Sequence, residues 1–238
     1  MRSLRSRSLD RSADHEGLHL IRAAVFDLDG TLVDNIGCHI EAFRAVGRRV
    51  GFDMDEASFQ AFNGQKNDEI FPRLLGRELA RAELDALAEE KEATYRALYG
   101  PKMAPHRGAI ELLERLRAGG IRLAVASAAP PANRSMVLDG LGLSAMFDAV
   151  VASEGLRGKP APDIFLAAAE QIGAAPETCI AFEDATAGVR AAVAAGMLVV
   201  GVTTNATARA LSAAGARFVI ADFVTLPAEL EAMLPPRH

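Results

Sequence analysis

Residues 23–32 read Ala-Ala-Val-Phe-Asp-Leu-Asp-Gly-Thr-Leu, so an apolar run leads directly into two carboxylates and a Gly-Thr turn. The run predicts a buried strand that ends at the first acid. Residues two apart on a strand point to the same side, so Asp27 and Asp29 are expected to converge on one small object. Two like charges that close are unfavourable unless a cation or a shared proton relieves them. The stretch therefore indicates Mg²⁺ and a reactive carboxylate, with an ordinary Asp-Gly turn after a strand as the alternative.

Short apolar runs alternate with longer amphipathic stretches through most of the chain. This alternation predicts βαβ units and a parallel sheet covered by helices on both faces. The predicted fold class is therefore α/β, a Rossmann-like, doubly wound parallel sheet. The expected strands are residues 22–27, 122–126, 149–152, 179–182, 198–202 and 218–220, and helices are expected at 108–118, 161–172 and 188–195, among others.

The stretch from residue 36 to about 99 breaks this rhythm, because its apolar residues recur at helical spacing, as in Ile40, Phe43 and Val46. A connection between a strand and the next helix is normally only a few residues long. The stretch therefore predicts an inserted all-helical cap, residues 35–100, on an α/β core of residues 21–34 and 101–238. It leaves the core at the carboxyl end of the sheet, where α/β proteins bind ligands, and so is placed to act as a lid.

Composition excludes several classes of protein. The net charge of −5 gives no general attraction to nucleic acid or anionic membranes, and no apolar run approaches the roughly 18 residues of a membrane span. The two cysteines, Cys38 and Cys179, match no metal-binding spacing, which favours a reducing compartment and a cytoplasmic location. Residues 1–20, rich in Arg and Ser, are predicted to form a disordered tail. A monomer is expected.

Three further stretches carry polar groups where strands should end. Ser127 and the amide of Ala128 could hold a phosphate oxygen, although serine also commonly begins a loop. Lys159 is followed by proline, so its ammonium is held in place and could neutralise a phosphoryl group; the alternative is a solvated lysine. Glu183 and Asp184 follow another apolar run and could bind a metal, although Asp184 also suits the N-cap of the next helix.

Taken in order, the Asp-x-Asp-Gly-Thr, Ser, Lys-Pro and Glu-Asp stretches resemble the four motifs of the haloacid dehalogenase superfamily of phosphotransferases. The resemblance covers about residues 21–225. The helical insertion is similar to the α-helical cap of one subfamily, closest to the β-phosphoglucomutase-like group. The resemblance implies an enzyme of the phosphomonoester hydrolase type that uses Mg²⁺ and acts on a small phosphorylated metabolite.

The same resemblance implies roles for the acids. Asp27 would be the nucleophile that forms an aspartyl-phosphate, and Asp29 the general acid and base. Mg²⁺ would bind the Asp27 carboxylate, the Asp29 backbone carbonyl and Asp184, with Glu183 in support. Burial and crowding by other acids are expected to raise the pKa of Asp29.

The resemblance also implies a phosphoryl-binding set of Ser127, Ala128 and Lys159. His39 and Lys91 lie where the β-phosphoglucomutase-like group has a histidine and a lysine near the substrate. The full set of predicted substrate-binding residues is Thr31, His39, Asn63, Gly64, Lys66, Lys91, Ser127, Ala128 and Asn133.

The insertion departs from the mutase pattern at one place. A mutase of this group holds a second phosphate with a lysine and an arginine that flank a glycine, and here Asn63 and Asn67 stand at those positions. An amide replaces a bidentate arginine poorly, although Lys66 or Asn133 could compensate. We therefore predict a Mg²⁺-dependent phosphatase of small metabolites, most readily sugar phosphates. The alternatives are a β-phosphoglucomutase, an inorganic pyrophosphatase and, disfavoured by the insertion and Asp29, a non-enzymatic phosphoacceptor receiver module.

Overall fold

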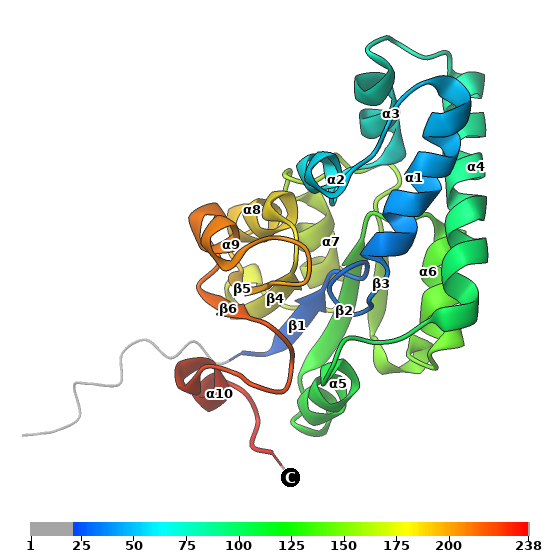
Figure 1. Ribbon diagram of the computed structural model, residues 1–238. Helices are drawn as coiled ribbons and strands as arrows, with labels where there is room; N and C mark the ends of the chain where they lie inside the picture. The colour runs from blue at the N-terminus through cyan, green and yellow to red at the C-terminus, as the bar shows by residue number, and fades with distance from the viewer. Residues whose placement is uncertain (1–20, 238) are drawn as a thin grey trace, which may run out of the picture.

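The computed structural model describes residues 21–237, so the predicted tail over residues 1–20 lies outside the described part of the chain. Six strands form one sheet in the order β3-β2-β1-β4-β5-β6, and every neighbouring pair is parallel. Figure 1 shows β1 in the middle of the molecule. The strands are β1 (Ala23–Phe26), β2 (Arg122–Ser127), β3 (Ala149–Ala152), β4 (Cys179–Glu183), β5 (Leu198–Val202) and β6 (Phe218–Ile220).

The central strand explains why the apolar run decides the fold. All four residues of β1 are buried, because β2 and β4 flank the strand and helices cover both faces. Each predicted strand is present and begins and ends within one residue of the expected bounds. The predicted Rossmann-like fold class is therefore confirmed.

Two hydrophobic clusters hold helices against the two faces of the sheet. One face packs against α7 (Asp163–Gln171), α8 (Thr186–Ala194) and α9 (Ala208–Ala214), whose buried residues belong to one cluster with Val25. The other face packs against α5 (Ala109–Ala118), α6 (Pro131–Gly140) and α10 (Ala228–Met233), whose buried residues belong to one cluster with Phe26. Phe26 also stacks on Phe182 of β4, with ring centroids 4.6 Å apart.

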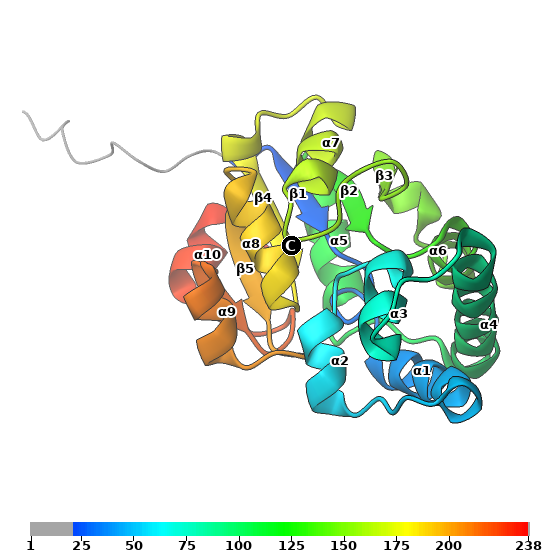
Figure 2. The same ribbon diagram turned by 90° about the horizontal axis from the view of Figure 1, so that it is seen from above.

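Four helices follow β1 and precede α5 and β2: α1 (Ile36–Val50), α2 (Glu56–Phe62), α3 (Asn67–Leu75) and α4 (Arg81–Tyr99). We refer to these residues, 36–99, as the helical insertion. A third hydrophobic cluster, built around Phe43, Phe59 and Phe71, holds them together. Figure 2 shows the four helices grouped on the opposite side of the molecule from α9 and α10. The division of the chain into a cap and a core at residues 35 and 100 stays a prediction.

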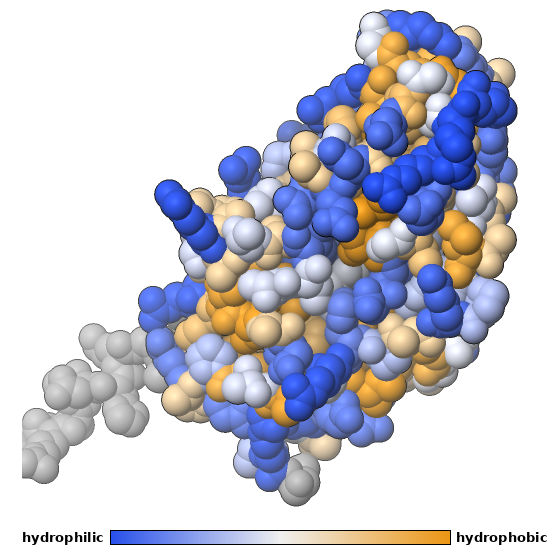
Figure 3. All heavy atoms as spheres, viewed as in Figure 1, coloured by the Kyte–Doolittle hydropathy of each residue, from blue (hydrophilic) through white to orange (hydrophobic). Residues whose placement is uncertain are grey.

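In the face seen in Figure 3, hydrophobic residues form separate patches divided by hydrophilic ones. Between residues 21 and 237, no helix combines the length and apolar character that crossing a membrane requires.

Candidate active site

Three carboxylates from two neighbouring strands converge at one edge of the sheet. Strands β1 and β4 are parallel and in register at Phe26 and Phe182, so the residues that follow leave the sheet side by side. Asp27, Glu183 and Asp184 each offer an oxygen within 4.8 Å of the others, and all three side chains are buried. The carboxyl end of such a sheet is the ligand-binding edge of α/β proteins.

Lys159 lies among these acids. Its ammonium donates to Asp27 Oδ1 and to Glu183 Oε1, at 2.6 Å each, and to the Ala126 carbonyl oxygen at 3.3 Å. Burial alone would lower the pKa of Lys159, but the two carboxylates raise it, so the side chain stays charged. The lysine is therefore fixed in the site, as its Lys-Pro sequence indicated.

One ammonium does not balance three buried carboxylates. Burial, opposed by Lys159 and helped by Glu183, raises the pKa of Asp27 to about 8, and burial together with Glu183 raises that of Asp184 well above its usual range. A divalent cation would relieve this crowding. The donors are all oxygen atoms, which Mg²⁺ prefers, so the residues present fit that ion.

Glu183, the last residue of β4, and Asp184, which follows it, have different partners. Glu183 is committed to Lys159 and, through Oε2, to the Ala185 amide at 2.8 Å. Asp184 accepts from the Thr31 hydroxyl and from the Asn63 side-chain amide, at 3.0 Å each. Asp184 is not the N-cap of α8, since that position is Ala185. The alternative reading of Asp184 as a helix cap is therefore wrong.

Gly30 allows Asp184 to approach the first strand. Its φ is +81°, and a Cβ at this position would lie 2.4 Å from Asp184 Oδ2. Glycine is the residue that adopts such a φ without strain. The Asp-Gly-Thr turn is thus required by the close packing of β1 against the acids of β4.

Asp29 lies outside the group of three and is held by other residues. Asn35 Nδ2 donates to Asp29 Oδ1 at 2.5 Å, and His39 Nε2 lies 3.7 Å from the same oxygen. Burial would raise the pKa of Asp29, but His39 and Asn35 lower it below the usual range. The expectation that this pKa is raised is therefore wrong, because the crowding acids surround Asp27 and Asp184 instead.

The end of β2 contributes backbone and hydroxyl groups. Ser127 is buried, and its Oγ accepts from the Ala129 amide at 3.0 Å, which leaves its own hydroxyl hydrogen available for another acceptor. Ala128 lines the cavity described next.

A cavity of about 70 Å³, partly open to solvent, lies between the acids and the helical insertion. Of the predicted site residues, the acids Asp27, Asp29, Glu183 and Asp184 line it together with His39, Asn63, Gly64, Lys91 and Ala128. The remaining lining residues include Phe43, Phe59, Phe62, Gln65, Asn67, Ile70, Glu92, Ala129 and Pro130.

Four predicted substrate-binding residues are not among those that line this cavity: Thr31, Lys66, Ser127 and Asn133. Thr31 is buried beneath it and donates to Asp184. Lys66 donates to the carbonyl oxygens of Ser153, at 2.7 Å, and Leu156. Asn133 is also buried, held by residues of α4, and so lies behind the cavity wall.

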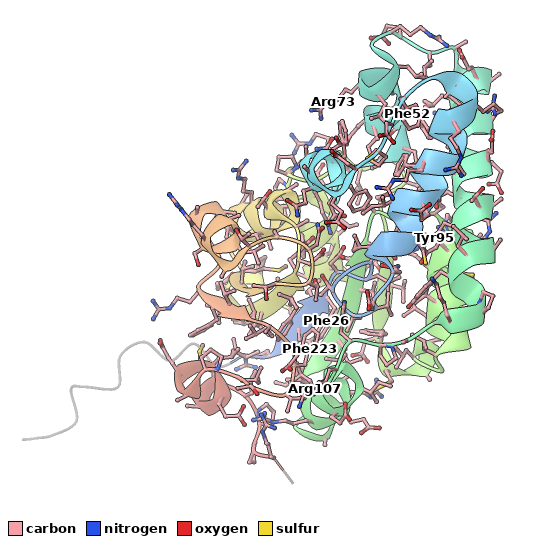
Figure 4. All side chains as sticks on the ribbon, in the orientation of Figure 1. Phe26, Phe52, Arg73, Tyr95, Arg107 and Phe223 are labelled. Atoms are coloured by element: carbon pink, nitrogen blue, oxygen red, sulfur yellow. The ribbon has the colours of Figure 1, made fainter. Side chains whose placement is uncertain are left out.

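Sequence reasoning missed Asn35, Tyr95 and Glu92. Asn35 Nδ2 also donates to the Tyr95 hydroxyl at 2.8 Å, and the Tyr95 ring stacks on His39 with centroids 4.0 Å apart. Figure 4 shows Tyr95 on α4, beside α1. Glu92, Tyr95 and Tyr99 follow one another at helical spacing, so an acid on the apolar stripe of α4 was the signal that could have identified Glu92.

The chain is similar to known phosphatases and mutases. It is 37% identical to fructose-1-phosphate phosphatase YqaB of Escherichia coli over 73% of this chain and 92% of the relative, and 32% identical to β-phosphoglucomutase of Bacillus subtilis over 76% and 83%. The crystal structure of β-phosphoglucomutase from Clostridium difficile superposes with a TM-score of 0.78 at 30% identity, covering 88% of this chain and 95% of that one.

A sequence model described as haloacid dehalogenase-like hydrolase matches residues 21–196, which include all the predicted catalytic residues. The predicted enzyme class, a phosphomonoester hydrolase, is confirmed. The chain belongs to the haloacid dehalogenase-like hydrolases.

Proposed function

We propose that this hydrolase is a Mg²⁺-dependent phosphatase that removes the phosphoryl group of small sugar phosphates through an aspartyl-phosphate on Asp27. The observation that carries the proposal is the buried group of Asp27, Glu183 and Asp184, in which Lys159 bridges Asp27 and Glu183, beside a cavity that the acids and the helical insertion both line. A relative at 37% identity bears the name of a sugar phosphate phosphatase.

In this proposal an Asp27 oxygen attacks phosphorus, and the bond from phosphorus to the sugar oxygen breaks. Lys159 and Ser127 hold the phosphoryl oxygens. The Asp27 and Asp184 carboxylates and the Asp29 backbone carbonyl, with Glu183 in support, would hold Mg²⁺, which supplies positive charge for the transferring group. Water then attacks the aspartyl-phosphate, which returns Asp27 and releases inorganic phosphate.

Asp29 handles the proton in both halves of the reaction. Its position beside His39 and Asn35 favours the ionised carboxylate in the free enzyme. A phosphate dianion that enters the cavity raises the pKa of a nearby carboxylate, so Asp29 would take up a proton from solvent when the substrate binds. The proton passes to the leaving sugar oxygen, and Asp29 recovers one from the attacking water.

A panel of substrates tests this function. Phosphate release is measured from fructose 1-phosphate, β-glucose 1-phosphate and pyrophosphate, with Mg²⁺ and with a chelator. We expect release from the sugar phosphates that stops when the metal is removed. Release from pyrophosphate alone, or the same rate with chelator, would contradict the proposal.

A further inference from the structure

Glu92 is a buried acid on the insertion side of the cavity. Its side chain lines the cavity from α4 and is 4% exposed. A carboxylate is an unfavourable group to bury unless charge and hydrogen bonds compensate it. Its presence in a site for phosphorylated molecules, which are themselves anions, calls for a physical explanation.

Three donors hold the Glu92 carboxylate. Lys91 donates to Oε1 at 2.9 Å and Asn67 to the same oxygen at 2.7 Å, while Asn133 of α6 donates to Oε2 at 2.6 Å. A carboxylate oxygen accepts two hydrogen bonds, so Oε2 keeps one free acceptor position. Burial would raise the pKa of Glu92, but Lys91 and His39 hold it below its usual range, so the group is an anion at neutral pH.

The lysine and arginine side chains on the insertion side of the cavity already have hydrogen-bond partners within the protein. Lys91 donates to Glu92 and contacts His39 Nδ1 at 2.9 Å. Lys66 donates to two backbone carbonyls outside the cavity, and Arg96 donates to Asn133 and to Glu89. Among the described residues that line the cavity, Lys91 is the single lysine or arginine, and the adjacent Glu92 balances it.

These contacts determine what the wall can recognise. A bound sugar hydroxyl could donate to the free position on Oε2, whereas a second phosphoryl group would meet an anion with no uncommitted cation to balance it. We propose that Glu92 is a specificity-determining residue, which accepts a hydrogen bond from a hydroxyl of the leaving group and excludes substrates with a second phosphoryl group. This inference rests on the proposed phosphatase function and names its substrate class, the monophosphates whose leaving group is a neutral polyhydroxylated compound. Specificity here comes from a repulsive group as much as from an attractive one.

The test compares fructose 1-phosphate with fructose 1,6-bisphosphate, which differ in the distal phosphoryl group alone. The kcat/KM for phosphate release is measured for both, in the parent enzyme and in Glu92→Gln, Glu92→Asp and Glu90→Gln. Glu90 lies on the same helix and pairs with Arg49 at the surface, so Glu90→Gln removes the same charge away from the cavity.

We expect the parent enzyme to prefer the monophosphate by tenfold or more. Glu92→Gln should lower that preference at least tenfold, both by slower monophosphate turnover and by faster bisphosphate turnover. Glu92→Asp, which keeps the charge, should retain the exclusion of the bisphosphate, and Glu90→Gln should leave the preference within twofold of the parent value.

Each outcome is informative. A parent enzyme that hydrolyses both substrates equally overturns the inference, even if Glu92→Gln does not fold. An unchanged preference in Glu92→Gln also overturns it, provided that the melting temperature shows this variant to be folded. If the parent enzyme releases phosphate from neither compound nor from any other sugar monophosphate, the proposed function itself has failed.

Discussion

The Asn35 side chain, next to Asp29, uses both of its amide hydrogens and its carbonyl oxygen in hydrogen bonds. One amide hydrogen goes to Asp29 Oδ1 and the other to the Tyr95 hydroxyl oxygen, while Asn35 Oδ1 accepts from the Gly30 amide at 3.0 Å. The residue is 1% exposed. It therefore ties the loop after β1 to α4 and fixes the direction of the acid that is proposed to move protons.

The substitution Asn35→Ala tests this positioning. We expect kcat on an alkyl phosphate to fall roughly tenfold to hundredfold, because misplacing a catalytic group costs about that much. A loss of about 1–3 kcal/mol in the free energy of unfolding is also expected, because the Gly30 amide loses its acceptor and Asp29 and Tyr95 lose a donor. The readout is kcat for an alkyl and an aryl phosphate; the aryl substrate, whose leaving group needs less protonation, should lose less. An equal loss for both would limit Asn35 to a role in stability.

Asp27 is the residue on which the proposed mechanism depends most directly. The substitution Asp27→Asn should abolish turnover, because an amide is a poor nucleophile, while the fold should survive because the crowding of acids is relieved. Phosphate release and melting temperature are measured beside Asp34→Asn, which makes the same change at an exposed position in the same loop. If a clean Asp27→Asn preparation keeps more than a few per cent of the parent activity, Asp27 is not the nucleophile.

At the scale of elements, the polar residues at the strand ends were predictable from the sequence. The contacts that the helical insertion makes around Glu92 were not. Asp27, Ser127 and Glu183 follow apolar runs, and parallel strands bring their ends to one edge. The strand order that places β4 beside β1 depends on long-range pairing and has no local signal. The partners of Glu92 come from α3 and α6, so they depend on how three helices meet.

Helix α10 is held to α5 by an ion pair whose strength depends on pH. Hydrogen bonds from Arg237 and then Arg115 lower the pKa of Glu231 to about 2. The folded state has the lower pKa, so this stabilisation is complete above the unfolded value of 4.5 and is lost as the pH falls toward 2.

We therefore expect Glu231→Gln to lower the free energy of unfolding by about 1 kcal/mol at pH 7. The difference from the parent should narrow between pH 5 and pH 3 as the parent loses its own ion pair. Urea unfolding at three pH values measures the difference in the free energy of unfolding. Glu229→Gln is the control, because Glu229 pairs with Arg217 in an exposed position on the same helix. A difference that is the same at every pH would show that the ion pair is not its cause.

At the scale of the whole molecule, the cavity forms where the helical insertion meets the sheet edge. Contacts join the two sides: Asn63 to Asp184, Lys66 to the loop after β3, and Glu92 to Asn133. In the proposed function, the side that supplies the chemistry and the side that contacts the leaving group are therefore distinct. In this arrangement the insertion can influence what becomes of the phosphoryl group without any change in the acids.

The last prediction concerns that fate. We expect β-glucose 1-phosphate to be hydrolysed and not isomerised. A mutase must keep its bisphosphate intermediate bound while the sugar turns, and this needs a cationic grip on the distal phosphate. Asn63 and Asn67 carry no charge, and Lys66 and Asn133 are already committed to other partners. Water should therefore reach the aspartyl-phosphate before the sugar can return.

Product analysis distinguishes the two outcomes. A coupled assay for glucose 6-phosphate runs beside an assay for inorganic phosphate, with and without catalytic glucose 1,6-bisphosphate. Inorganic phosphate should form faster under both conditions. If glucose 6-phosphate forms faster and the bisphosphate stimulates it, the enzyme is a mutase. Lys66 would then have to leave the Ser153 and Leu156 carbonyls to bind the distal phosphate, so Lys66→Met should abolish isomerisation while phosphate release from an aryl phosphate continues.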